Sequence, residues 1–204
     1  MSRNFVVLEK AGLEQTPVRR PEAPVRPRRT HAALIERLFQ GPSVLAIIGT
    51  TAQGPDHVCA ELAAELGERN RRVLIVPVGN LLHMNPVVAP DEASFTPAGS
   101  PNVWRWPVSG AQRIEFFKPR RVDAPGNWLE VIRNSFDTVL LSCPPLDRSP
   151  GVAEVAAMAG RAVLVAEAGQ TGKQQLRTMQ SSLQLRGVAL LGSILIQGSN
   201  RHAD

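Results

Sequence analysis

The sequence predicts an α/β protein in which helices cover both faces of a mainly parallel central sheet, giving a three-layer α/β/α arrangement. Short, continuously apolar segments alternate along the chain with segments of helical periodicity, which is typical of parallel strands buried on both faces. The 204 residues are enough for one core, and contents of 43% hydrophobic and 20% charged residues are ordinary for a globular domain. No apolar run approaches the roughly 20 residues that a membrane span needs, and we expect no signal peptide.

The first 29 residues have a different composition and are expected to form a basic, proline-rich arm ahead of a domain at residues 30–204. Residues 2–15 are predicted to form a short helix, with Phe5, Leu8 and Leu13 near one face. Prolines at positions 17, 21, 24 and 27 then favour a stiff, extended linker. Seven basic residues oppose three acidic ones in the arm, so it carries +4 of the chain's net charge of +5. Such an arm can meet an anionic membrane surface, or it can be a solvated linker.

The domain is predicted to alternate strands and helices. Thr30 is placed to cap a helix over residues 31–40. Strands are then predicted at residues 43–48, 72–76, 103–106, 138–141, 162–166 and 190–196, and helices at 55–69, 127–134, 151–159 and 173–185. Ligands of such sheets bind beyond the carboxyl ends of the strands. Any site should therefore lie near residues 49–56, 77–79 and 142–145.

The loop after the first domain strand has the frame of a phosphate-binding loop but not its charged residues. Gly49 and Gly54 match both glycines of G-x-x-x-x-G-K-[ST], between a strand and a helix. Pro55 and Asp56 follow where the lysine and the hydroxyl residue belong. Proline brings neither charge nor N–H, and an aspartate would repel a phosphate. We therefore expect Asp56 to replace the ligand's anion with an internal one, aided at the helix N-terminus by Thr50 or Thr51, so that the loop is stable when empty.

Several further segments resemble the bacterial tyrosine kinases (BY-kinases) of exopolysaccharide biosynthesis, within the MinD/ParA-like group of P-loop ATPases. The similarity covers most of the chain and is poorest over residues 80–125. Its most specific part is the strand that ends in two prolines, at residues 136–145 (FDTVLLSCPP). The other similar segments are residues 1–5 (MSRNF), 8–12 (LEKAG), 71–76 (RRVLIV), 161–169 (RAVLVAEAG) and 191–196 (LGSILI).

The departures from this family fall on its nucleotide and metal ligands. Pro55 replaces the phosphate-loop lysine and Asp56 the Mg²⁺-binding hydroxyl. Pro77 and Gly79 stand where acids are expected after the second strand, and Ser142 replaces the Mg²⁺-linked aspartate. We therefore expect no catalytic residue, no nucleotide cofactor and no metal. The four histidines lack metal-ligand spacing, and Cys59 and Cys143 form no metal or disulfide pattern.

The resemblance implies a degenerate BY-kinase, a pseudokinase-like regulator in exopolysaccharide synthesis or export. The partner it implies is a membrane polysaccharide co-polymerase or a related active kinase, and the localisation is cytoplasmic or peripheral at the inner membrane. The chain contains no tyrosine, so it cannot phosphorylate itself on one. Two alternatives stay open: an atypical ATPase or tyrosine kinase, and a ParA-like module that binds membrane or DNA. Nucleic acid is not the expected partner, because the domain shows no arginine-rich helix or aromatic platform. Salt-sensitive binding to duplex DNA or anionic vesicles would identify the last alternative.

Overall fold

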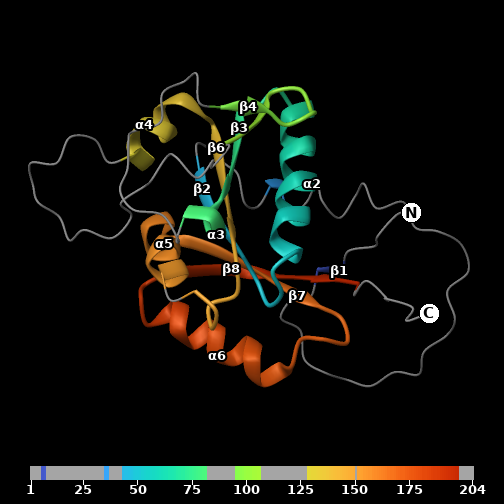
Figure 1. Cartoon of the computed structure of the whole chain (residues 1–204), viewed down its shortest axis with the longest axis vertical. Coiled ribbons are helices and arrows are strands. Elements are labelled where there is room, and N and C mark those ends of the chain that lie inside the picture. The colour runs from blue at the N-terminus through green and yellow to red at the C-terminus, as the bar shows by residue number, and fades with distance from the viewer. Residues whose placement is uncertain are drawn as a thin grey trace, which may run out of the picture.

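A computed structural model shows one sheet with helices on both of its faces (Figure 1). The structure describes residues 6–7, 35–36, 43–81, 95–106, 128–149 and 151–197. Within these residues the sheet has eight strands in the order β1-β8-β7-β2-β6-β3-β5-β4. The strands are β1 (Val6–Val7), β2 (Ser43–Gly49), β3 (Val73–Pro77), β4 (Thr96–Pro97), β5 (Val103–Arg105), β6 (Thr138–Cys143), β7 (Arg161–Glu167) and β8 (Ala189–Ile196).

The central strands are parallel, and only the two short outermost strands run the other way. Strands β8, β7, β2, β6, β3 and β5 pair in parallel, whereas β1 is antiparallel to β8 and β4 is antiparallel to β5. The helices that connect the parallel strands are α2 (Gly54–Glu68), α3 (Val78–Leu81), α4 (Trp128–Ser135), α5 (Gly151–Ala159) and α6 (Lys173–Gln184). The predicted α/β/α arrangement with a mainly parallel sheet is thus confirmed.

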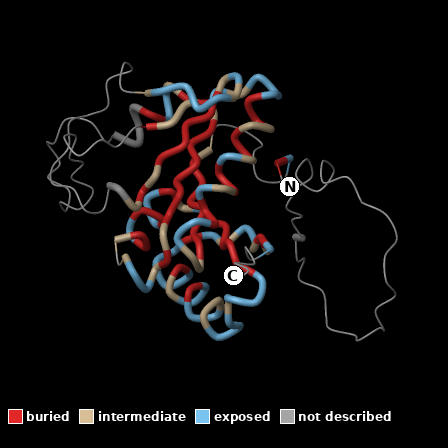
Figure 2. The backbone as a smooth tube through the Cα atoms, turned by 45° about the vertical axis from the view of Figure 1, so that its right-hand side comes forward, coloured by how far each residue is buried: buried red, intermediate tan, exposed pale blue. Residues whose placement is uncertain are grey.

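Side chains on the two faces of the sheet build two separate parts of the core. In β2, Leu45 and Ile47 face the apolar side of α2, whereas Val44, Ala46 and Ile48 face the side covered by α4, α5 and α6. Successive strand residues point to opposite faces, so a strand buried on both sides is apolar at nearly every position. Figure 2 shows these strands as the buried centre of the molecule, with exposed positions mostly on the helices and loops around them.

Most predicted domain elements are confirmed to within one or two residues at each end. The predicted N-terminal helix is wrong at residues 6–7, which form strand β1 and pair with Ile194 and Leu195 of β8. Strand β8 would otherwise present unpaired backbone groups at the edge of the sheet. Antiparallel pairing with residues 6–7 satisfies some of these groups, and this pairing competes with local helix formation. Of the predicted helix over residues 31–40, Ile35 and Glu36 are helical.

Other predictions fall on residues that the structure does not describe. The rest of the arm and most of the helix over residues 31–40 lie outside the described ranges. The boundary between arm and domain at residue 30 therefore stays a prediction. Among the helices that the structure describes, none has the length and apolar character needed to cross a membrane.

Candidate functional site

The sequence-predicted site residues gather at the carboxyl edge of the sheet, on the face covered by α2. Gly49 ends β2, and Ser142 in β6 is the register partner of both Ile47 in β2 and Pro77 in β3. Helix α2 starts at Gly54, so Asp56 lies in its first turn above this edge. Parallel strands bring their carboxyl ends to the same edge, which explains why segments far apart in the sequence meet here.

The turn between β2 and α2 is tightly packed around its two glycines. A Cβ atom at Gly49 would lie 2.5 Å from Cγ and 2.6 Å from Cδ of Pro55, and it would also overlap the carbonyl oxygen of Thr51. The buried ring of Pro55 therefore covers the backbone of Gly49. This close approach explains why glycine is needed at position 49. It also places an apolar ring where the phosphate-loop frame calls for a lysine.

The carboxylate of Asp56 is held by two side chains from the sheet. Ser142 Oγ donates a hydrogen bond of 2.7 Å to Asp56 Oδ1. Arg105 Nη2, at the end of β5, lies 3.6 Å from the same oxygen. Ser142 is only 6% exposed, whereas the side chains of Asp56 and Arg105 are 51% and 44% exposed. The cluster thus has a buried hydroxyl below a half-exposed ion pair.

Asp56 differs in one respect from the role expected for it. It was expected to satisfy the first N–H groups of α2, but the N-cap residue is Gln53, which makes no side-chain cap hydrogen bond. Asp56 is in the first turn, where a negative charge is still favourable for the helix dipole. Its side-chain contacts with Ser142 and Arg105 tie the start of α2 to the sheet instead.

Thr50 also has a different partner from the one expected. Its Oγ1 lies 2.6 Å from Oγ1 of Thr171, which in turn accepts a 2.8 Å hydrogen bond from the backbone N–H of Glu167. The backbone N–H of Thr50 donates to the carbonyl oxygen of Val165 at 2.9 Å. These bonds attach the β2–α2 turn to β7 and to the loop that follows it. The turn is therefore held by the protein's own groups on this side as well.

Gly79 and the two cysteines lie close to the site without adding charge to it. A Cβ at Gly79 would face the ring of Pro144 at 3.6 Å, in ordinary van der Waals contact. Cys59 and Cys143 are both buried. Burial is the main reason why the pKa of the Cys59 thiol lies well above its usual value, and negative charge on Cys143 and Asp56 raises it further. Burial likewise raises the pKa of Cys143. Neither thiol is therefore a nucleophile at neutral pH.

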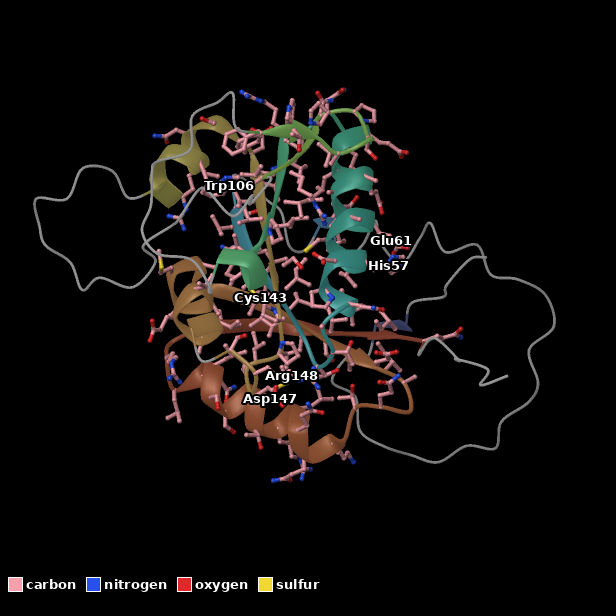
Figure 3. All side chains as sticks on the ribbon, viewed as in Figure 1. His57, Glu61, Trp106, Cys143, Asp147 and Arg148 are labelled. Carbon is pink, nitrogen blue, oxygen red and sulfur yellow. The ribbon has the colours of Figure 1, made fainter. Side chains whose placement is uncertain are left out.

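Figure 3 shows how the labelled polar residues around the site are arranged. His57 and Glu61 lie one turn apart on α2, with His57 Nε2 3.1 Å from Glu61 Oε1. Cys143, Asp147 and Arg148 mark the end of β6 and the loop beyond it. Among the described residues, no group of three or more His, Cys, Asp or Glu side chains could hold a metal ion. The arrangement around Asp56 is thus one hydrogen bond and one half-exposed ion pair that meet at a single carboxylate oxygen.

Arg105 is the site residue that sequence reasoning missed. It lies in a three-residue strand between two segments rich in proline and glycine, and no motif marks it. Its register partner is Ile75 in β3, which faces α2. Residues that pair in register point to the same face of a sheet. The alternation of side chains between the two faces of β5 is the one signal that could place Arg105 beside Asp56, and it requires the register of β5 to be known.

Comparison with known proteins identifies the fold. No protein-family profile and no curated protein matches the sequence. Among solved structures, the chimerical protein CapA2B2 aligns with a TM-score of 0.63 at 13% identity, covering 86% of this chain and 85% of that one. The kinase domain of the Escherichia coli tyrosine kinase ETK aligns with a TM-score of 0.60 at 19% identity, covering 87% and 76%.

The MinD cell division protein of Aquifex aeolicus is also similar, with a TM-score of 0.53 at 17% identity, covering 72% of this chain and 65% of that one. The chain therefore has the fold that a tyrosine kinase domain and MinD share. The resemblance to BY-kinases and MinD/ParA-like ATPases is confirmed at the level of the fold.

Proposed function

We propose that this chain is a non-catalytic relative of the BY-kinases that acts as a binding or regulatory partner in exopolysaccharide synthesis or export. The fold shared with the ETK kinase domain supports the relationship. The absence of a catalytic role is inferred from the replaced positions. Pro55, Asp56, Pro77 and Ser142 stand where the resembling family carries a lysine, a hydroxyl residue and two acids.

One observation carries the proposal: a carboxylate of the protein itself is bonded at the N-terminal turn of α2. A nucleotide phosphate would have to approach the negative charge of Asp56, which Ser142 and Arg105 hold in place. Two like charges about 4 Å apart repel each other by roughly 4 kcal/mol at the effective dielectric of a protein surface, and this is an upper limit here because Arg105 offsets part of the charge of Asp56. In active phosphate loops a lysine offsets such repulsion, and Pro55 cannot do so.

The partner and the location follow from the resemblance rather than from a contact in the structure. We propose the cytoplasmic side of a membrane polysaccharide co-polymerase, or a related active kinase, as the partner. The protein would then be cytoplasmic and reach the inner membrane through that partner. A regulatory role of this kind requires only the shape of a kinase domain and not its chemistry.

The decisive experiment is a titration of the full-length protein with ATP and with ADP in the presence of Mg²⁺, by calorimetry and by thermal unfolding. We expect no binding tighter than about millimolar, because the lysine and the Mg²⁺ ligands are replaced. The ETK kinase domain, titrated in parallel, is the positive control. A micromolar dissociation constant, or a clear Mg·ATP-dependent rise in melting temperature, would instead favour the atypical ATPase or kinase.

A reconstructed loop tests the physical reason. Pro55→Lys combined with Asp56→Ser restores G-x-x-x-x-G-K-S, so inorganic phosphate should stabilise this variant more than the natural protein. ATP hydrolysis should not appear, since Pro77 and Ser142 still lack the acids that place Mg²⁺ and water. If phosphate stabilises both proteins equally, Asp56 does not fill the anion position and this explanation fails.

A further inference from the structure

The positive charge that lies beside the carboxylate of Asp56 belongs to an arginine of the protein itself. Arg105 Nη2 lies 3.6 Å from Asp56 Oδ1, the same oxygen that accepts the 2.7 Å hydrogen bond from Ser142 Oγ. The three residues come from β5, α2 and β6, which are separate in the sequence. Two strands of the sheet thus supply a hydroxyl donor and a guanidinium group to one oxygen atom in the first turn of α2.

The chemistry of these residues does not fit the Mg²⁺ ion that the fold's relatives would place here. In the resembling family, a hydroxyl stands at the position of Asp56 and a carboxylate at the position of Ser142. This chain has the reverse, and the two groups are bonded directly to each other. Mg²⁺ needs near-octahedral oxygen coordination and usually keeps several waters. One carboxylate oxygen already shared by Ser142 and Arg105 is a poor ligand for it.

We propose that the guanidinium of Arg105 takes the place of a metal cation at this site. It keeps the Asp56 side chain turned toward Ser142 and prevents divalent cations from binding to the carboxylate. The argument rests on the proposed function, because it explains how the degenerate site stays stable without a ligand. Arginine suits the task, since its guanidinium stays charged at any physiological pH and cannot leave as an ion can. Arg105 is in this view a positioning residue and not a catalytic one.

The arginine that precedes β3, Arg72, does not share this role. The guanidinium of Arg72 lies 5.7 Å from the ring centroid of Trp104 and 5.5 Å from that of Phe136. Its backbone N–H donates to Asp137 at the amino edge of the sheet, opposite to Asp56. Of these two arginines, Arg105 is therefore the one whose guanidinium lies at the site.

The test uses Mn²⁺ as a probe on the full-length, nucleotide-free protein. Paramagnetic broadening of amide signals in the first turn of α2 and around Ser142 reports ion binding at Asp56, even when binding is weak. Arg105→Gln should show a given broadening at about two- to fivefold lower Mn²⁺ than the natural protein, the scale set by a half-exposed charge pair. Arg177→Gln, which removes one exposed positive charge from α6 on the other face, should behave like the natural protein.

Two further variants separate the proposal from other outcomes. Adding Asp56→Asn to Arg105→Gln should abolish the gained broadening, and Arg105→Lys should return it toward the natural level. Equal Mn²⁺ response in the natural protein and Arg105→Gln would overturn the proposal, as would a gain that persists with Asp56→Asn. If Arg105→Gln does not fold, Arg105→Lys is used for the test. This variant keeps the positive charge, so broadening at lower Mn²⁺ than in the natural protein would also refute the proposal. ATP plays no part, so failure here is distinct from failure of the nucleotide titration.

Discussion

Replacing Asp56 by alanine tests how far this cluster stabilises the fold. The change removes the hydrogen bond to Ser142 Oγ and leaves that buried hydroxyl without its carboxylate partner. A hydrogen bond to a charged group contributes about 1.5–3 kcal/mol, and the lower end applies because Asp56 is half-exposed. The exposed ion pair with Arg105 adds less than about 1 kcal/mol, and the negative charge at a helix N-terminus adds about 0.3–1 kcal/mol. Because these terms overlap, we expect a total loss of about 2 kcal/mol.

The assay is urea unfolding at neutral pH, followed by circular dichroism, at low and at high salt. Glu154→Ala is the matched control, since Glu154 is an exposed acid in the first turn of α5. Glu154→Ala should lose only the part of the unfolding free energy that comes from a negative charge at a helix N-terminus. Asp56→Asn should fall between the natural protein and Asp56→Ala, and most of the salt dependence should vanish in it. If Asp56→Ala is no less stable than Glu154→Ala, the contacts with Ser142 and Arg105 do not stabilise the site and the reasoning is refuted.

Two other predictions concern the buried thiols and the arm. Because the pKa values of Cys59 and Cys143 are raised in the folded protein, stability should be unaffected by these groups below about pH 9 and should fall above it, where the unfolded chain loses thiol protons that the folded chain keeps. A Cys59→Ala/Cys143→Ala variant should have a flatter alkaline slope in urea unfolding, and an unchanged slope would contradict the assignment. Deleting residues 1–29 should lower the melting temperature by no more than about 5 °C, since it removes the two-residue pairing of β1 with β8. Calorimetry measures this, and a fall of many degrees would place the domain boundary earlier in the chain.

The alternation of apolar strands and amphipathic helices could be predicted from the sequence because the central parallel strands are buried on both faces and are therefore almost continuously apolar. Strand β6 illustrates this, with all of its residues buried from Thr138 to Cys143. The segment at residues 6–7 could not be predicted in the same way. Its strand conformation depends on an edge of β8 that lies far away in the sequence, and its local pattern fits a helix equally well.

The sequence by itself determined where a candidate site should lie and that Pro55, Asp56 and Ser142 stand at the positions where the resemblance leads one to expect a lysine, a hydroxyl residue and an acid. Strand ends and the two glycines of the β2–α2 turn are local features, so Gly49, Asp56 and Ser142 could be placed near one another beforehand. It did not determine what Asp56 binds. Ser142 lies 86 residues away, and Arg105 follows no motif. Only the register of β5, β3 and β6 and the position of α2 above them bring both groups to one oxygen atom. Side-chain contacts across a sheet depend on three-dimensional packing, which local sequence patterns do not encode.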